Sequence, residues 1–413
     1  PQTPNPKPQT PNPNPLNVKS LHLTSISLIM TDFNLFNTPL IVDFGSGQVK
    51  ADFSGEEEPK VIFDSWLGKP KYSKVLPIMK ETDVIGPSAD VRGLYKLEHA
   101  IERGVISSSN VARQIIDRVY NDLKITNTKD VPFFICEPPF TPKSQKQMLA
   151  ELLFDTYDSP TIFFGSQGVL SLYAFGKTNG IVLESGEGLT QVVPIYNGYK
   201  IENSIEKIKL GGQDVTNYLK LLLKKNGVSI NSASEDLLLK EIKESVCELQ
   251  STPFEEFRLT SNSKHDQMDK KTDEIKYSLP DGSQIPIEYE RFMASEILFN
   301  PSIAGHDSIG IGELINSAFK KLDLDLRKQL YGNIFVSGGN TMLNGFSERL
   351  AFELGQQISN KTKLSIIAPN SKRSLLVWQG ASAITNMNAF SKLWITKSEY
   401  HENGDRIFFT KSF

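Results

Sequence analysis

Two distant stretches of this chain repeat one pattern, and this repetition constrains the fold more than any other feature. They read IVDFGSGQVKADF (41–53) and IVLESGEGLTQVV (181–193). In each, a β-branched run ends at an acid, glycines follow at the second and fourth positions after it, and β-branched residues resume. The acids, Asp43 and Glu184, are 141 residues apart (184 − 43). Such runs around a short glycine turn predict a β-hairpin, so we expect the same hairpin twice.

Strand and helix patterns alternate along the rest of the chain. Runs rich in Val, Ile and Phe predict strands, and apolar residues at helical spacing predict helices. The strand runs lie near 39–44, 60–64, 131–137, 160–165, 180–184, 191–196, 333–339 and 363–367. The helical runs lie at 108–123, 142–157, 168–175, 212–225, 234–249 and 312–322. This alternation predicts an α/β fold. If each hairpin opens its own sheet, the chain forms two similar domains, with a helix at 163–176 as a candidate hinge.

Composition indicates a globular chain with little net charge. The chain has 413 residues, of which 39% are hydrophobic, and a formal net charge of −3. This balance predicts no direct nucleic-acid partner and no membrane-surface partner. The apolar stretch 21–30 is too short to span a membrane and lacks the features of a signal peptide. Cys136 and Cys247 lie in apolar patterns, which favours buried thiols in a reducing cytosol or nucleus.

Two segments have compositions that disfavour a packed structure. Residues 1–15 repeat PQTPNP, and a tract of Pro, Asn, Gln and Thr has little to bury against the entropic cost of ordering it. We therefore expect residues 1–38 to form a disordered tail. Residues 258–274 are polar and charged, and we expect a mobile surface insertion there.

The glycine turns suit a phosphate ligand. Residues without side chains leave backbone amides bare for close approach, and phosphate oxygens accept from such amides. A carboxylate beside phosphate is repulsive unless a cation lies between them. Mg²⁺ keeps several of its waters, so Asp43 and Glu184 can hold those waters while the phosphates bind the metal. Lys50, on the strand that leaves the first turn, adds positive charge. For either hairpin alone, an ordinary glycine turn is the favoured interpretation. The pair, in matching register and one in each expected domain, is a much stronger signal.

Two further clusters are compatible with a nucleotide. FVSGGNTM (335–342) ends a strand and opens a helical run, where bare amides can take phosphate or the sugar and base. Lys240, Lys243 and Glu244 share one helix face at spacings of three and four residues. By itself that face also fits a solvated stripe of salt bridges.

Beyond these clusters, the chain resembles the actin family from about residue 38 onward. Segments GSQGVLSLYAFGKTNGIVLESGEG, VPIYNGY, GGQDVTNYL, LPDGSQIPIEYERF, SEILFNPS, SGGNTM and WITKSEYHENG occur in actin order. The resemblance implies duplicated ribonuclease-H-like domains in two lobes, with four subdomains and a cleft for ATP or ADP with Mg²⁺ or Ca²⁺. One lobe would comprise 39–174 and 376–413, and the other 175–375. It also implies actin, actin-like subunits and actin-binding proteins as partners, in the cytoplasm and cytoskeleton or in the nucleus.

The resemblance also assigns roles to individual residues. Gln167 matches the glutamine that positions the attacking water, and together with Asp43 and Glu184 it would form the catalytic group. The phosphate contacts would be Gly45, Ser46, Gly47, Lys50, Gly186, Glu187 and Gly188. The ribose and adenine contacts would be Lys240, Lys243, Glu244, Gly338, Gly339 and Met342. Without the family match, an ordinary glutamine on a helix surface is the favoured interpretation of Gln167.

The departures from actin lie at the chemistry and at the filament contacts. Glu184 and Glu187 stand where typical actins have aspartate, and Gln191 replaces a histidine that helps to order the catalytic water. Changed neighbours of the site are Phe44, Arg103 and Ser374. Misplacing water or metal by about 1 Å can cost roughly a hundredfold in rate, so we expect slow hydrolysis. Segment 73–87 replaces the mobile intersubunit loop, and 299–308 replaces the interstrand plug.

Three classes of function follow from these features. The first is a cytoskeletal ATP-binding subunit that polymerises or copolymerises with actin. The second is a non-polymerising actin-related subunit of a larger complex, such as a chromatin remodeller, dynactin or a branched-filament nucleator. The third comprises sugar kinases and chaperone ATPases, which share the two-lobed ATP clamp. A kinase needs a carboxylate base beside an acceptor hydroxyl, and the sequence indicates no independent acceptor site.

Overall fold

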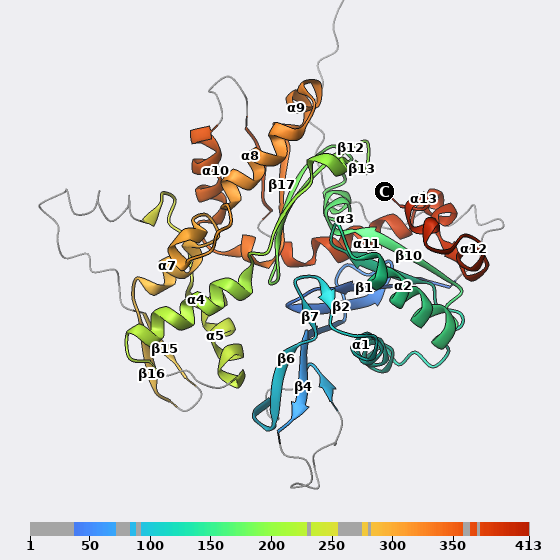
Figure 1. Ribbon diagram of the computed structural model, residues 1–413, viewed down its shortest axis with the longest axis horizontal. Coiled ribbons are helices and arrows are strands. Elements are labelled where there is room, and N and C mark those ends of the chain that lie inside the picture. The colour runs from blue at the N-terminus through green and yellow to red at the C-terminus, as the bar shows by residue number, and fades with distance from the viewer. Residues whose placement is uncertain are drawn as a thin grey trace, which may run out of the picture. The chain divides into compact units, whose positions relative to one another are not determined.

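The structure, a computed structural model, describes residues 37–71, 83–87, 92–228, 233–254, 275–279, 282–357, 364–369 and 372–412. Its strands and helices alternate along the chain (Figure 1). This alternation confirms the α/β prediction. The predicted tail up to residue 36, most of segment 73–87 and the insertion at 258–274 lie outside the described residues.

The first hairpin opens a six-stranded sheet. The order of its strands is β19-β10-β9-β1-β2-β3. β1 pairs antiparallel with β2 and parallel with β9, and β9 pairs parallel with β10. The strands are β1 (Leu40–Phe44), β2 (Gln48–Phe53), β3 (Val61–Asp64), β9 (Phe133–Glu137), β10 (Thr161–Ser166) and β19 (Ile395–Thr396).

The second hairpin opens a sheet with the same topology. Its order is β13-β12-β11-β17-β18, in which β11 pairs antiparallel with β12 and parallel with β17. β17 in turn pairs parallel with β18, just as β9 does with β10. The strands are β11 (Gly180–Ser185), β12 (Thr190–Tyr196), β13 (Tyr199–Lys200), β17 (Ile334–Ser337) and β18 (Ile366–Ile367), with β14 (Glu206–Ile208) beside β12.

The two hairpins also share one register. Asp43 lies opposite Lys50 in the first, and Glu184 lies opposite Gln191 in the second. Each acid is thus seven residues before its partner, and the same turn length separates the paired strands. Register is set by the turn and by the buried face, so equivalent residues occupy equivalent places in the two sheets.

Smaller strands and the helices complete the fold. The additional strands are β4 (Trp66–Pro70), β5 (Val84–Ile85), β6 (Tyr95–His99), β7 (Ile101–Glu102), β8 (Val105–Ile106), β15 (Ile275–Ser278) and β16 (Gln284–Ile287). The helices are α1 (Ser109–Asp122), α2 (Lys143–Glu151), α3 (Gln167–Ala174), α4 (Gly212–Lys225), α5 (Ala233–Val246), α7 (Glu290–Glu296), α8 (Ile311–Lys321), α9 (Leu324–Leu330), α10 (Phe346–Gln357), α11 (Leu376–Thr385), α12 (Lys397–Asn403) and α13 (Ile407–Thr410).

Most helix predictions agree with the structure, with local differences at the ends. α1 begins after Ser108, whose hydroxyl accepts from the Val111 amide and so satisfies one of the free N–H groups of the first turn. Helix α2 ends earlier than predicted, because the chain widens into a π-helical turn at Leu152–Thr156. The candidate hinge 163–176 is not a single helix. Its first four residues belong to β10, and α3 supplies 167–174.

Helices α3 and α11 each follow one sheet and pack in the core of the other. α3 follows β10 of the first sheet, yet Val169 and Leu172 pack among the core residues of the second. α11 follows β18 of the second sheet, yet Trp378 is fully buried with Ile41 of β1. The helices lie side by side in Figure 1, and a Cβ at Gly380 would be 1.8 Å from the Leu170 carbonyl oxygen. Glycine is therefore required at this crossing.

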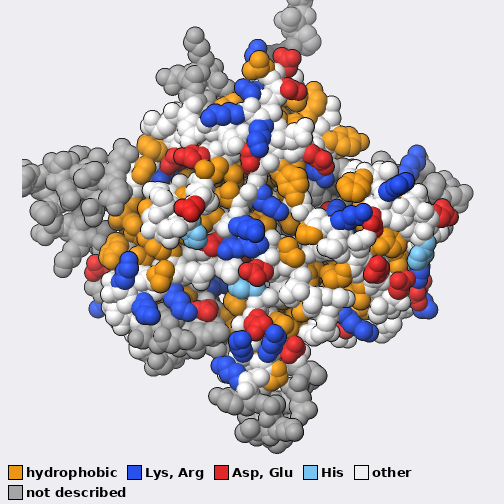
Figure 2. All heavy atoms as spheres, in the orientation of Figure 1, with side chains coloured by type: hydrophobic (Ala, Val, Ile, Leu, Met, Phe, Trp, Pro, Cys, Tyr) orange, Lys and Arg blue, Asp and Glu red, His pale blue; other side chains and the backbone are white. Residues whose placement is uncertain are grey.

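Three features of the described residues can be compared with the expectations from composition: the cysteines, the surface charge and the length of the helices. Cys136 and Cys247 are both buried and free. On the face shown in Figure 2, acidic and basic side chains are interspersed. In the described ranges, no helix has the length and apolar character needed to cross a membrane.

Candidate functional site

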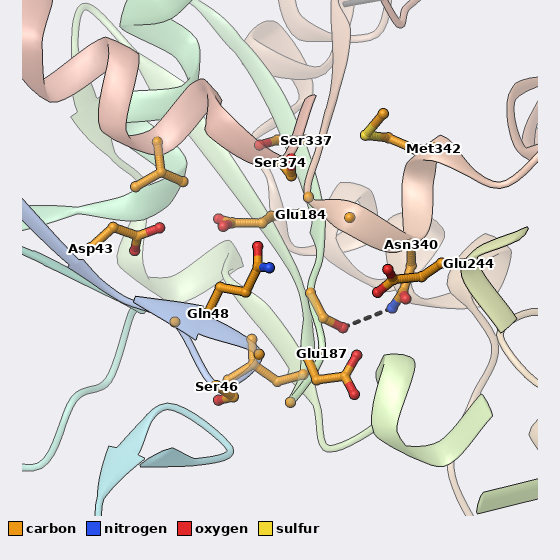
Figure 3. A pocket seen from close by; sticks show the side chains of 18 of the residues that line it. Asp43, Ser46, Gln48, Glu184, Glu187, Glu244, Ser337, Asn340, Met342 and Ser374 are labelled. Atoms are coloured by element: carbon orange, nitrogen blue, oxygen red, sulfur yellow. Dashed lines mark hydrogen bonds between the residues drawn. The ribbon is translucent and has the colours of Figure 1, made fainter. Parts of the chain in front are cut away.

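A cavity of about 420 Å³ lies where the two glycine hairpins meet. Every residue that the sequence predicts for the nucleotide, the metal or catalysis lines this one cavity. The predicted lining residues are Asp43, Gly45, Ser46, Gly47, Lys50, Gln167, Glu184, Gly186, Glu187, Gly188, Lys240, Lys243, Glu244, Gly338, Gly339 and Met342. Figure 3 shows the side chains of Asp43, Glu184, Glu187 and Glu244 around it.

The tips of the two hairpins pack against each other reciprocally. A Cβ at Gly47 would lie 2.8 Å from Cβ of Glu187, and a Cβ at Gly188 would lie 2.5 Å from Oγ of Ser46. Ser46 and Glu187 are equivalent positions in the two repeats, as are Gly47 and Gly188. Each second glycine therefore receives the tip side chain of the other hairpin. The sequence pattern predicted bare amides at these glycines, whereas the structure uses the missing side chains to let the tips touch.

Two other glycines face open space. A Cβ at Gly186 would meet nothing closer than the Leu189 carbonyl oxygen at 3.9 Å, and a Cβ at Gly339 would meet nothing within 4 Å. Both line the cavity, so a side chain there would occupy ligand space. Gly338 differs, because its φ of +95° disfavours other residues and a Cβ would lie 2.3 Å from the Ser185 carbonyl oxygen.

The two acids have different hydrogen-bond donors. Lys50 Nζ lies 3.2 Å from one oxygen of Asp43, and Gln167 Nε2 donates to the other at 3.1 Å. Glu184 accepts from Gln191 Nε2 at 2.8 Å. Burial raises the pKa of Glu184 to about 7, the hydrogen bond from Gln191 opposes that rise, and the nearby Asp43 adds to it. Gln191 itself is fully buried.

Two lysines of α5, Lys240 and Lys243, form hydrogen bonds with residues from other elements around the cavity. Lys243 Nζ donates to Glu187 Oε2 and to the Gly212 carbonyl, each at 3.0 Å. Lys240 Nζ bonds Asp64, at the end of β3, at 2.9 Å. This second bond connects a helix beside the second hairpin to a strand of the first sheet. Of the helix face predicted from spacing, the two lysines therefore pair with carboxylates, Glu187 of the cavity and Asp64 of β3, whereas Glu244 is exposed.

Arg103 clasps the second hairpin from a tight turn between β7 and β8. Arg103 and Gly104 have φ of 50° and 81°, both in the left-handed region used by two-residue hairpin turns. Arg103 bonds both oxygens of Asp214, at 2.6 and 2.7 Å, and donates to the Gly188 carbonyl at 2.7 Å. The next amide, Gly104 N, donates to Ser46 Oγ at 2.9 Å. One turn therefore contacts both hairpin tips.

Comparisons with known proteins identify the family of this chain. A family model described as Actin matches residues 35–413. The chain belongs to the actin family. Among curated proteins, an actin-like protein from Neurospora crassa is 37% identical over 381 residues, which cover 92% of this chain and 99% of that protein. The resemblance inferred from the sequence is therefore confirmed.

Several lining residues of this actin-family chain were not assigned to the site by sequence reasoning. Asn340 lies within the quoted SGGNTM segment, which was the available signal. Ser337 lies in the same segment and Gln48 lies in the first repeat, whereas Pro138 carried no signal of its own. Phe44 and Ser374, noted only as departures from actin, also line the cavity. Arg103 was noted as a departure without a partner, because Asp214 lies far from it in sequence.

The lining fits a phosphorylated ligand with a divalent cation. A cavity of this size lies within the usual range for small-molecule sites, roughly 300–1,000 Å³, and it combines lysines with glycine backbone. Asp43 and Glu184 would repel phosphate unless a cation intervened. In the described part of the chain, no group of three or more His, Cys, Asp or Glu side chains is arranged to hold a metal. The carboxylates of Asp43 and Glu184, which line the cavity, suit an ion that takes its remaining ligands from phosphate and water.

Proposed function

We propose that this actin-family protein binds ATP or ADP together with Mg²⁺ (or Ca²⁺) in the cavity between its two glycine hairpins. The observation that carries the proposal is the matched pair of hairpins, which have one register, reciprocal tips, and an acid from each in one cavity. A ligand there contacts both sheets. Its binding energy therefore holds the two halves together.

The proposal divides the chain into two lobes. Residues 39–174 with 376–413 would form one lobe, and 175–375 the other, each with a larger and a smaller subdomain. In support, Ile395 and Phe408 pack in the core that contains β1, although they are distant from it in sequence. The helices α3 and α11 would act as the hinge, because they cross between the two cores.

Each set of residues has a distinct role in this proposal. The backbones of the two tips and Lys50 hold the phosphates, while the α5 residues Lys240, Lys243 and Glu244, with Gly338, Gly339 and Met342, surround the ribose and adenine. Asp43 and Glu184 hold water molecules of the cation, which neutralises developing phosphate charge when bound. Gln167, the first residue of α3, orients the attacking water.

We propose that hydrolysis is slow. Glu184 and Glu187 carry one methylene more than the aspartates of typical actins. The Nε2 group of Gln191, which replaces a histidine, is already bonded to Glu184. Gln191 also lies outside the residues that line the cavity. An ordered water thus loses a donor that actins provide.

For assembly, we propose that the protein polymerises or copolymerises with actin in the cytoplasm or the nucleus. One observation favours the alternative, a non-polymerising subunit of a larger complex. Segment 299–308 forms a 3₁₀ turn at Pro301–Ala304, closed by Gly305, and Tyr218 Oη donates to the Ile303 carbonyl. Ile303 and Ala304 pack partly against the second core. A plug segment that packs against its own subunit makes fewer contacts with a neighbouring subunit in a filament.

A thermal melt tests the nucleotide site, and sedimentation tests assembly. With Mg-ATP at a hundred times its Kd, we expect about 2.7 kcal/mol of added stability, with less added when EDTA removes the cation. Absence of any shift with ATP or ADP would overturn the proposed site. Pelleting of the pure protein or with actin supports assembly, whereas a soluble protein that binds nucleotide favours the complex subunit.

A further inference from the structure

We infer that Asn340 is a positioning residue that fixes the orientation of the Gly186–Glu187 peptide in the second hairpin. This inference rests on the proposed nucleotide function, which it deepens. Asn340 lies in the turn of 339–342 that follows β17, and it is 6% exposed. Its Nδ2 donates to the Gly186 carbonyl at 2.7 Å and to Ser185 Oγ at 3.0 Å. The first of these bonds is drawn in Figure 3.

The carbonyls of the second tip all have donors outside the tip. The Gly186 carbonyl also accepts from the Gly212 amide at 3.0 Å, and the Glu187 carbonyl accepts from the Gln213 amide at 2.9 Å. These donors are the first amides of α4. The Gly188 carbonyl accepts from Arg103. The tip is therefore anchored through its oxygens, by three different elements of the fold.

Peptide geometry converts this anchoring into a direction for the amides. In a planar trans peptide, the C=O of one residue and the N–H of the next point in opposite directions. When α4 and Asn340 hold the Gly186 oxygen, the Glu187 N–H must point away from both of them. We assign that direction to the phosphate end of the cavity, because Gly186, Glu187 and Gly188 all line it.

The hydrogen bond from Asn340 to the Gly186 carbonyl acts as a brace. Gly186 needs such a brace because it has no side chain. Its backbone rotates more freely than that of other residues, and the space beside it is open. A rotated peptide would turn the carbonyl oxygen toward the phosphates and the amide away from them. An asparagine suits the brace, since its amide supplies two donors, and a carbonyl has two acceptor sites, filled here by Gly212 and Asn340.

The inference is tested by two substitutions of similar size. Asn340→Leu removes both donors without adding charge, and Asn340→Asp places an acceptor opposite the Gly186 carbonyl. We expect Asn340→Leu to weaken ATP and ADP binding about tenfold, the effect of one lost hydrogen bond, and Asn340→Asp to weaken it more. Adenosine binding should weaken less than ATP binding in both variants, because adenosine has no phosphate to contact the tip, although Asn340 itself lines the cavity between Gly339 and Met342.

Asn344→Asp provides the matched control. Asn344 lines the same cavity and is exposed, so this substitution adds the same charge without removing the brace. It should lower ATP binding less than Asn340→Asp does. Equal losses for ATP and adenosine in Asn340→Leu would indicate a general structural role and overturn the inference, as would unchanged binding of both.

Hydrogen exchange separates this inference from the proposed function. Loss of the brace should free the acceptor of the Gly212 amide, so its exchange in the ligand-free protein should accelerate at least severalfold in Asn340→Leu. An unaltered Gly212 exchange rate would overturn the brace, whether or not nucleotide binds. If the natural protein binds no ATP, ADP or adenosine while Gly212 exchange does accelerate, the brace stands and the nucleotide proposal fails.

Discussion

Opposite its acid, the first hairpin carries Lys50 and the second carries Gln191. The two positions are equivalent in register, and each side chain donates to the acid across from it. Asp43 is thus paired with a positive charge and has a second donor in Gln167. Glu184 accepts from a neutral donor, and both acids are buried. The same backbone therefore holds one carboxylate in an ion pair and one whose hydrogen-bond donor is neutral.

This difference shows what a duplicated hairpin preserves and what it leaves free to change. Sheet topology, register and tip packing are common to both copies, because they depend on backbone and on glycines. Charge depends on single side chains. The cost of burying the Glu184 carboxylate appears as its raised pKa, which the hydrogen bond from Gln191 and the charge of Lys50 offset only in part. A cation from outside the chain can offset that cost at the second hairpin, which supports the proposed metal there.

The largest predicted effect comes from breaking the reciprocal tips. Gly188→Val would drive a side chain into Ser46 and the Arg103 backbone. We expect a loss of about 3 kcal/mol in the free energy of unfolding, the upper end of the cost of overpacking. Chemical denaturation measures this loss. Gly186→Ala is the matched control, since its Cβ has room within the fold. It should keep stability but weaken nucleotide binding, and equal destabilisation by the two would contradict the packing described for the tips.

The next effect concerns Arg103, in the turn that contacts both hairpin tips. Arg103→Met leaves Asp214 without its charged partner, although the Gly211 amide still donates to it at 2.8 Å. We expect a loss of about 2 kcal/mol, as for hydrogen bonds to charged groups, together with faster release of bound nucleotide. Arg118→Met is the control, because Arg118 bonds the Ile85 and Gly86 carbonyls on the side of the first sheet. If both variants released nucleotide at one rate, Arg103 would have no special role.

A charge exchange sharpens the comparison directly. Gln191→Lys gives the second hairpin the donor of the first, and the new ammonium should compete with the divalent cation for Glu184. We expect the Mg²⁺ concentration at the midpoint of the titration to rise about tenfold, which is equivalent to a loss of about 1.4 kcal/mol in Mg²⁺ binding. Titrating Mg²⁺ at fixed ATP measures it. Lys50→Gln, the reverse exchange, should instead lower the affinity of the protein for ATP itself. An unchanged Mg²⁺ titration in Gln191→Lys would mean that Glu184 does not face the cation.

The sequence could predict what local pattern encodes. Apolar runs with glycine spacing predicted both hairpins. Apolar residues at helical spacing predicted α1 to α5 and α8, but α7 and α9 to α13 were not predicted. The actin resemblance collected residues that all line one cavity. The ligand of that cavity stays a prediction. Local pattern also explains the misassigned 163–176 segment, because a buried apolar run reads alike as strand or helix. There, β10 ends at Ser166 and α3 starts at the next residue.

Contacts between distant residues could not be predicted in this way. The packing of Ser46 on Gly188, the Arg103 pair with Asp214 and the Asn340 bond to Gly186 each join residues far apart in the chain. Nothing in the neighbourhood of Arg103 indicates its partner. Such contacts depend on how two sheets meet, which is a tertiary property. The departures from actin were visible in the sequence, but their partners were not.

The smallest predicted effect concerns the chemistry that differs between the hairpins. Restoring the actin pattern with Glu184→Asp, Glu187→Asp and Gln191→His together should speed phosphate release from Mg-ATP about fivefold. This is well below the roughly hundredfold that a 1 Å misplacement can cost, because Gln167 and Asp43 are already in hydrogen-bond contact. Single-turnover phosphate release measures the rate. Glu137→Asp, which shortens a buried carboxylate outside the main cavity, should leave it unchanged. If the triple variant were no faster, the longer carboxylates would not limit hydrolysis, and the slow step would lie in cleft opening instead.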